Sequence, residues 1–374
     1  MALYGQWKQI GTDLTGEDPT DAFGSNFTGI SLSSDGSILA VGTHNNDGDG
    51  GEDGEIVDGG HVRIFENINN TWTQVGSDID GEEAYSYSGR TVSLSNDGSI
   101  VAIGAAHFDG YDTNLPFWER EAYKRGSGPH GQVKIYKNEN GNWTQIGGAI
   151  NGDISGSNNY FGWSVNLSSD GSIVGIGGQY SDWSRVYQNV NNDWVQINQE
   201  MVDVRSSGQT SLSADGSIFA IADDNGGTLQ NGKVSIFKNI EGLWTQIGNS
   251  IEAERARDEE SLLGTSIELS EDGSTVAIGV PYTNQMQEAG LVRVYKNVNG
   301  SWIKIGEDIQ GENNPDEFGM TVSLSSDGSI VAIGAPSDHT NGAWGGSTTI
   351  YGGSVQIYQN INNSWVQMGD DIVG

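Results

Sequence analysis

Apolar and polar residues alternate along short stretches of this chain, and turn-forming residues separate the stretches. Residues 318–325 alternate in this way, a Ser-Asp-Gly-Ser turn follows at 326–329, and residues 330–334 are almost all apolar. An Asp-Gly pair between two such stretches predicts a β-hairpin, because glycine tolerates the positive φ that the turn needs. Residues 355–358 alternate again, and residues 365–368 follow an Asn-Asn turn. The pattern therefore predicts four consecutive strands, which we call a, b, c and d.

This four-strand pattern is repeated along the whole chain. The aspartate of the a–b turn recurs at Asp35, Asp97, Asp170, Asp215, Asp272 and Asp327. The tryptophan that opens strand d recurs at Trp7, Trp72, Trp143, Trp194, Trp244, Trp302 and Trp365. There are thus six copies of the first motif and seven of the second. We interpret the six aspartates as turn formers whose carboxylates accept hydrogen bonds from nearby backbone N–H groups.

Four-stranded units repeated at this spacing are typical of β-propeller blades, which bury their faces against one another. The sequence predicts an all-β protein, a six-bladed β-propeller of four-stranded antiparallel blades, with residues 1–374 as one domain. The predicted units are 23–77, 85–148, 159–198, 205–249, 262–307 and 317–369, with an extra outer strand at 6–11.

We expect terminal strands to close the ring, and the surplus d strand leaves several arrangements open. The strand at Trp7 completes the last blade beside residues 355–358, or the strand at Trp365 does so while the N-terminal copy frays. Alternatively, the chain is a piece of a longer array. A seven-bladed ring ranks second, because it needs another whole unit.

The composition limits the possible partners. The chain has 50 Asp and Glu against 17 Lys and Arg, a formal net charge of −33, and no cysteine. This charge repels phosphate backbones, so we expect no nucleic-acid ligand. No apolar run is long enough to span a bilayer, so we expect no membrane insertion. The acidity indicates either simple solubility or cation binding. Residues 1–10 have neither the basic start nor the apolar core of a signal peptide.

The strings Phe161-Gly162-Trp163-Ser164-Val165 and Phe318-Gly319-Met320-Thr321-Val322, together with Gly334-Ala335-Pro336, resemble FG-GAP repeats. The resemblance covers essentially the whole chain, although Leu263-Gly264 and Ser88-Gly89 replace the Phe-Gly pair in other units. These repeats build the propeller of integrin α subunits and of bacterial and algal surface proteins. The resemblance implies adhesion or ligand binding at an extracellular or cell-surface location, but no specific ligand.

The FG-GAP family often binds Ca²⁺ in the a–b hairpin, but the Asp-Gly turns of this chain are too short for such a loop. One acidic loop, residues 45–53, instead has the alternating oxygen ligands that Ca²⁺ prefers, in a b–c connection. Its candidate ligands are Asn45, Asp47, Asp49, Gly51 and Asp53. The alternative is a solvated acidic loop without an ion.

The long connections b–c and d–a are predicted to lie on one face, where binding sites on repeat scaffolds usually form. Aromatic residues of these connections are the ligand-binding candidates, namely Trp118, Tyr123, Tyr180, Trp183, Trp344 and Tyr351. Their rings suit stacking on sugars or on a protein partner. The alternative is that they pack as lids over the blade edges.

The enzyme motifs that we find lack their usual structural context. Residues 126–131 fit GxGxxG but precede a strand, so they cannot present a helix N-terminus to a pyrophosphate. We therefore expect a noncatalytic binding or adhesion module, a monomer that takes a protein or glycan ligand on the long-loop face. The alternative is a glycan-active enzyme or a lectin with its site in the loop-side mouth, for which paired carboxylates are plentiful.

Overall fold

The computed structural model describes fourteen stretches of the chain, separated by gaps. They are residues 6–17, 23, 29–46, 59–83, 86–106, 131–153, 160–179, 184–197, 208–223, 232–254, 260–283, 289–312, 316–336 and 353–374. The chain divides into two compact units, one of residues 9–202 and one of residues 1–8 with 203–374. Within the described stretches every regular element is a strand, and no helix there could span a membrane.

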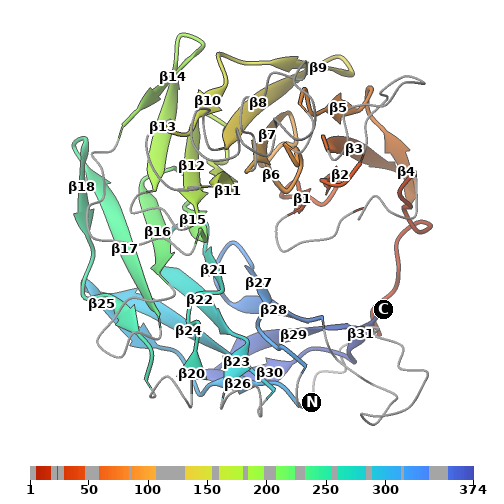
Figure 1. Cartoon of the computed structure of the whole chain (residues 1–374). Coiled ribbons are helices and arrows are strands. Elements are labelled where there is room, and N and C mark those ends of the chain that lie inside the picture. Colours follow the sequence, from red (N-terminus) through yellow and green to blue (C-terminus); the bar gives the residue numbers. More distant parts are fainter. Residues whose placement is uncertain are drawn as a thin grey trace, which may run out of the picture. The chain divides into compact units, whose positions relative to one another are not determined.

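The unit of residues 9–202 contains three blades, which Figure 1 shows as neighbouring sheets. Blade 1 consists of β1 (Ile30–Leu32), β2 (Ile38–Thr43), β3 (His61–Ile68), β4 (Thr71–Gln74) and β5 (Ile79–Asp80). Blade 2 consists of β6 (Thr91–Leu94), β7 (Ile100–Ala105), β8 (Gln132–Glu139), β9 (Asn142–Gln145) and β10 (Ile150–Asn151). Blade 3 consists of β11 (Phe161–Leu167), β12 (Ile173–Gly178), β13 (Arg185–Val190) and β14 (Asp193–Gln196).

The unit of residues 1–8 and 203–374 contains the other three blades. Blade 4 consists of β15 (Thr210–Leu212), β16 (Ile218–Asp223), β17 (Lys233–Ile240), β18 (Leu243–Gln246) and β19 (Ile251–Glu252). Blade 5 consists of β21 (Ser266–Leu269), β22 (Thr275–Val280), β24 (Leu291–Val298), β25 (Ser301–Lys304) and β26 (Ile309–Gln310), beside a small sheet of β20 (Glu260–Ser261) and β23 (Tyr282–Thr283). Blade 6 consists of β27 (Thr321–Leu324), β28 (Ile330–Ala335), β29 (Ser354–Ile361), β30 (Ser364–Gln367) and β31 (Ile372–Val373).

Each blade is an antiparallel sheet with its strands in the order a, b, c and d, as in a meander. The predicted six-bladed β-propeller is therefore confirmed. The outer strand of blade 6 is β30, which carries Trp365 and pairs with β29. Residues 6–10, which include Trp7, lie in no strand. Of the arrangements left open by the sequence, the structure thus supports Trp365 as the outer strand of the last blade.

The a–b turns form as predicted. In all six, the carboxylate of the turn aspartate accepts a hydrogen bond of 2.9 Å from the amide two residues later, as Asp215 does from Ser217. Hydrogen bonds from Ser37 and Ser33 lower the pKa of the exposed Asp35 carboxyl to about 2. The carboxylate form is therefore the one that the turn requires.

The c–d turns rely on a second repeated side chain, an asparagine near the end of strand c. In blade 6 the amide of Asn363 donates to Oδ1 of Asn360 at 3.1 Å, and the five other blades repeat this bond. Asn362 and Asn363 have φ of 52° and 67°, the pair of left-handed residues of a type I′ turn. Asparagine and glycine tolerate this region best, which explains the composition of these turns.

A short fifth strand was not predicted from the sequence. In blade 5, β26 pairs with the start of β24, so that Ile309 lies opposite Val292. Blades 1, 2, 4 and 6 repeat this pairing. The isoleucine fills the space beside the outer strand. The short strand itself continues the chain from strand d toward the next blade.

The core lies between neighbouring blades. Ala277, Val292 and Ile309 of blade 5 form one cluster with Phe318 and Ile333 of blade 6, and all five are buried. Each further described cluster likewise joins two consecutive blades. A blade therefore buries its apolar residues against its neighbours rather than within its own sheet.

Paired glycines allow neighbouring blades to approach backbone to backbone. A Cβ atom on Gly279 of blade 5 would lie 2.0 Å from the carbonyl oxygen of Gly319 in blade 6. Gly42 meets Gly89 and Gly104 meets Gly162 in the same way, at 1.8 and 2.3 Å. One glycine follows the Phe position of its repeat, and the other is the last residue but one of strand b. This contact is the physical reason for both motif glycines.

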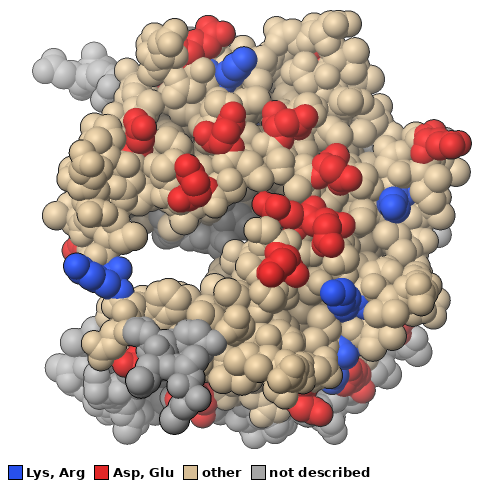
Figure 2. Space-filling model, turned by 180° about the vertical axis from the view of Figure 1, so that it is seen from behind, with Lys and Arg blue, Asp and Glu red and all other residues tan. Residues whose placement is uncertain are grey.

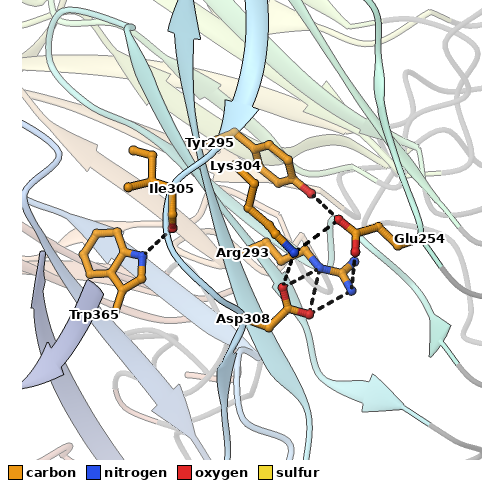
Figure 3. Close-up of polar contacts among 7 residues, drawn as sticks. All are labelled: Glu254, Arg293, Tyr295, Lys304, Ile305, Asp308 and Trp365. Atoms are coloured by element: carbon orange, nitrogen blue, oxygen red, sulfur yellow. Dashed lines mark hydrogen bonds and ion pairs between the residues drawn. The ribbon is translucent and has the colours of Figure 1, made fainter. Parts of the chain in front are cut away.

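The repeat tryptophans join neighbouring blades at their outer edge. The indole N–H of Trp365 in blade 6 donates to the carbonyl of Ile305 in blade 5 at 2.9 Å (Figure 3). Trp302 donates likewise to Ile247, also at 2.9 Å. In the other unit, Trp143 and Trp194 donate to the preceding blade at 3.0 and 2.9 Å. Each bond links a tryptophan to the residue three positions after the preceding blade's tryptophan.

We predict that Gly279→Ala lowers the free energy of unfolding by about 3 kcal/mol, because the added methyl group forces the two backbones apart. Gly148→Ala is the matched control, since a Cβ there meets no atom within 4 Å. Urea denaturation of both variants measures the difference. Equal stability of Gly279→Ala and the wild type would show that the blades are not held at this contact.

Candidate functional site

The residues predicted to bind a ligand lie outside the described stretches. These are Trp118, Tyr123, Tyr180, Trp183, Trp344 and Tyr351. Of the predicted calcium ligands, Asp47, Asp49, Gly51 and Asp53 also lie outside them, and Asn45 is half-buried in the turn after β2. The structure therefore neither gathers nor separates these two sets.

A cluster of four charged side chains lies in blade 5 and at the end of blade 4 (Figure 3). Arg293, whose side chain is fully buried, donates through Nε and Nη2 to the carboxylate of Asp308 at 3.1–3.2 Å. Lys304 contacts the same carboxylate at 2.9 Å. Glu254 lies 3.7 Å from Arg293 and 3.5 Å from Lys304, and it accepts a hydrogen bond of 3.4 Å from the Tyr295 hydroxyl.

The cluster is neutralised internally. Burial by itself raises the pKa of Asp308, but hydrogen bonds from Arg293 and Lys304 outweigh it and hold the pKa below its usual value. Burial by itself lowers the pKa of Lys304, but the hydrogen bond to Asp308 and the attraction of the Asp308 and Glu254 carboxylates together outweigh burial and raise this pKa. A buried arginine with a two-pronged carboxylate partner keeps its charge and fixes geometry. We therefore interpret the role of the cluster as structural: it links blades 4 and 5.

The equivalent positions of other blades support this structural interpretation. Gln356 donates to Asp371 at 3.2 Å in blade 6, and Ser235 and Ser250 share a hydrogen bond of 2.8 Å in blade 4. The same pair of positions thus holds a polar bond in blades 4, 5 and 6, with different residues in each. Sequence analysis missed the pair because its members are fifteen residues apart and differ in chemistry between blades.

A groove of about 510 Å³ opens between blades 5 and 6. Tyr358 and Trp365 supply aromatic surface to it, and Glu307, Asp308 and Gln310 supply acceptors. The ring of Tyr358 is fixed edge-on against Phe318 at 6.4 Å. Glu307 and Gln310 are exposed. Fixed aromatic surface beside several hydrogen-bond acceptors suits a polar ligand with an apolar face, such as a sugar ring.

Glu268 lies in strand a of blade 5, at a position where the other five blades have an uncharged residue. The equivalent residues are Ser31, Ser93, Asn166, Ser211 and Ser323. Burial raises the pKa of the Glu268 carboxyl to about 7. A carboxylic acid that keeps its proton near neutral pH can act as a general acid. This difference could have been found in the sequence, because Glu268 is the only acidic residue among the six equivalent positions.

Among the described residues, one group combines histidine and carboxylates at metal-ligand spacing. One ligand atom each from Glu17, His61 and Asp78 lies within 4.8 Å of the others. Nδ1 of the buried His61 is 3.8 Å from Asp78. These three groups could hold a divalent cation such as Zn²⁺, for which histidine and carboxylate are common ligands.

Comparison with known proteins identifies the fold and no family. No protein-family model matches the sequence, and no curated protein does so. Solved structures do match. Hydrazine synthase of Kuenenia stuttgartiensis has a TM-score of 0.55 at 14% identity, over 93% of this chain and 80% of that one. A putative 6-phosphogluconolactonase of Bacteroides uniformis has a TM-score of 0.58 at 12% identity, over 92% and 84%.

A periplasmic gluconolactonase of Pseudomonas aeruginosa also matches, with a TM-score of 0.52 at 15% identity, over 93% of this chain and 85% of that one. At these identities the likeness shows the fold alone. The protein is accordingly a member of the β-propeller fold class, and its function has to be argued from its own residues.

We predict that Glu268→Ser stabilises the protein in a pH-dependent way. A carboxyl whose folded pKa, about 7, lies above its ordinary 4.5 costs stability as the pH rises between these values. The variant should gain about 2 kcal/mol in free energy of unfolding at pH 8 and nothing at pH 4, with solvent screening allowed for. Urea denaturation at both pH values tests this, with the exposed Glu307→Ser as control. A gain that is independent of pH would contradict it.

Proposed function

We propose that this protein is a noncatalytic binding or adhesion module of the FG-GAP type, acting outside the cell or at its surface. The observation that carries the proposal is the contrast between constant blades and variable connections. The a–b turn and the c–d turn repeat in all six blades, and strand b always follows the same pattern. The b–c connections, by contrast, range from the short 179–184 to the long 106–131. A constant scaffold with variable connections is typical of binding proteins.

The charge of the protein favours a neutral or cationic ligand. Figure 2 shows Asp and Glu side chains spread over the face in view, with fewer Lys and Arg. The formal net charge of −33 repels polyanions over a range of about 8 Å at physiological salt. We therefore propose a neutral or basic glycan, or a protein with a basic surface, as the ligand.

The groove between blades 5 and 6 is the described surface that best fits such a ligand. Tyr358 and Trp365 offer ring surface, while Glu307 and Gln310 offer exposed acceptors. We propose that this groove contributes ligand contacts. Separately, the aromatic residues of the long connections, such as Trp118 and Trp183, remain our candidates for stacking on a ligand, and we propose that the protein binds its ligand as a monomer.

We also propose that calcium stabilises the loop 45–53. The support is its sequence, in which Asn45, Asp47, Asp49 and Asp53 place oxygen ligands close together. Carboxylates at such spacing repel one another unless a cation neutralises them. Calcium would then order a b–c connection of blade 1 and hold it for ligand binding.

A glycan-active enzyme is the second candidate, and Glu268 favours it. The pKa of this carboxyl, about 7, suits a general acid in glycoside hydrolysis. Two of the similar structures are named a putative 6-phosphogluconolactonase and a periplasmic gluconolactonase. We rank this candidate second because the described residues provide no second carboxylate with a matching role beside Glu268.

For the binding function, we predict that a glycan array shows binding to neutral or cationic oligosaccharides and none to heparin. The double variant Glu307→Lys/Gln310→Ala should weaken the strongest interaction by roughly tenfold, because a ligand in the groove loses its acceptors. Asp193→Lys, an exposed charge reversal in blade 3, is the control and should bind as the wild type does. Release of reducing ends from the bound glycan would favour the enzyme instead.

For the calcium site, we predict that EGTA lowers the melting temperature by several degrees and that added Ca²⁺ restores it. Asp49→Asn should remove the calcium response, while His61→Gln leaves it intact. The second variant therefore shows whether the calcium response comes from the loop or from the group of Glu17, His61 and Asp78. An unchanged melting temperature in EGTA would show that the loop binds no ion that matters for stability.

A further inference from the structure

An acidic residue follows five of the repeat tryptophans at a distance of ten positions. These residues are Glu17, Glu82, Asp153, Glu254 and Glu312. Three of them pair with a cation on strand c of the next blade, namely Glu82 with Lys134, Asp153 with Arg185 and Glu254 with Arg293. Each of these cations stands two residues before the tyrosine of strand c. The repeat thus uses the acidic position to bind the chain that enters a blade to the strand c of that blade.

In blade 5 a second carboxylate joins this ion pair (Figure 3). Nη2 of the buried Arg293 lies 3.7 Å from Glu254 and 3.1 Å from Asp308, so that one cation serves two carboxylates. Two carboxylates so close together repel each other unless a positive charge lies beside both. The arginine therefore makes this arrangement of two acidic groups stable.

Blade 1 has the same two carboxylate positions. Glu17 corresponds to Glu254, and Asp78 corresponds to Asp308, because each of these aspartates precedes the isoleucine of a short fifth strand. One oxygen of Glu17 lies within 4.8 Å of one oxygen of Asp78. Both residues belong to the unit of residues 9–202, so the pair lies within a single compact unit.

The arginine of blade 1 does not serve these carboxylates. Arg63 stands at the position of Arg293, two residues before an aromatic residue of strand c. Its Nε donates to the side chain of Gln74 at 3.2 Å, and its Nη1 donates to the carbonyl of Thr15 at 3.3 Å. Its guanidinium also lies over the ring of Phe65, 5.2 Å from the centroid. Among the described residues, Arg63 forms no ion pair with either carboxylate.

A buried imidazole lies beside the two carboxylates instead. His61 is 2% exposed, and its Nδ1 is 3.8 Å from Oδ2 of Asp78, which is too long for a hydrogen bond. Nε2 of His61 is buried and has no hydrogen-bond partner among the described residues. A buried imidazole without hydrogen bonds is strongly unfavourable, which points to a partner other than the surrounding side chains.

The spacing of the three groups is that of ligands around one metal ion. Two atoms that bind Zn²⁺ in a tetrahedral arrangement are about 3.4 Å apart, close to the separation of His61 and Asp78. Gln74 donates to the other oxygen of Asp78, Oδ1, and holds the carboxylate in place, as outer hydrogen bonds do for metal ligands. An imidazole nitrogen favours Zn²⁺ over Ca²⁺ and Mg²⁺, which prefer oxygen ligands.

We propose that Glu17, His61 and Asp78 form a binding site for a divalent transition-metal ion of the Zn²⁺ type. The ion takes the role that the buried arginine has in blade 5, and three protein ligands leave one tetrahedral position to water. It joins residues 11–17 to strand c of blade 1, in addition to the bond from Arg63 to Thr15. The site shares no residue with the loop 45–53 or with the groove between blades 5 and 6, so it stands or fails independently of both.

Metal titration of the full chain tests the site. We would remove metal with EDTA, exchange the buffer, and follow the binding of Zn²⁺ by calorimetry and by the melting temperature. We expect one ion to bind per chain with a Kd below about 10 μM and the melting temperature to rise. Co²⁺ in the same site should give the visible absorption of a tetrahedral complex. An excess of Ca²⁺ should not displace Zn²⁺, because the site offers Ca²⁺ too few oxygen ligands.

Variants of the three ligands test the geometry. Glu17→Gln and Asp78→Asn should each weaken Zn²⁺ binding by roughly tenfold or more, because each removes an anionic ligand. His61→Leu should abolish both Zn²⁺ binding and the Co²⁺ absorption. This variant should fold, because the equivalent residue of blade 5 is the buried Leu291.

The matched control is Glu82→Gln. Glu82 occupies the acidic position that precedes blade 2, and its carboxylate is paired with Lys134 at 2.6 Å. The control should therefore bind Zn²⁺ as the wild type does. Amide hydrogen exchange in residues 11–17 should slow when Zn²⁺ is added to the wild type or to the control, and it should not change in His61→Leu.

Three outcomes would overturn the proposal. The first is the absence of Zn²⁺ binding tighter than about 100 μM. The second is an equal loss of affinity in Glu17→Gln and Glu82→Gln, because the ion would then bind to surface carboxylates in general. The third is loss of the Zn²⁺ response in Asp49→Asn with full retention in Glu17→Gln, which would place the ion in the loop 45–53.

Discussion

The close approach of backbones between consecutive blades is the constraint on which the rest of the structure depends. Gly279 and Gly319 leave no room for a side chain at their contact, and Gly104 and Gly162 repeat this in another pair of blades. The contact sets the distance between two sheets near their inner strands. A tryptophan hydrogen bond, such as that from Trp365 to Ile305, sets it again at the outer strands. Because the distance between neighbouring sheets is fixed at both the inner and the outer strands, only the aliphatic side chains between the sheets can vary.

This constraint explains what could be predicted from the sequence. The Asp-Gly hairpins and the four strands were predicted because local alternation and turn chemistry determine them. The short strand Ile309–Gln310 was not, because two residues carry no period. The bond from Arg293 to Asp308 was also missed, since it depends on residues that adjoin only in the folded sheet. The contact between the motif glycines joins different repeats and was equally invisible.

The polar groups of the described blades are largely used by the scaffold itself. The turn aspartates are bonded to backbone amides, and Asp308 is bonded to Arg293 and Lys304. Such groups have little capacity left for a ligand. Recognition therefore falls to groups that the repeat does not require, which include the exposed acceptors Glu307 and Gln310 and the residues of the long connections. Glu268 is another, because its repeat position needs no charge.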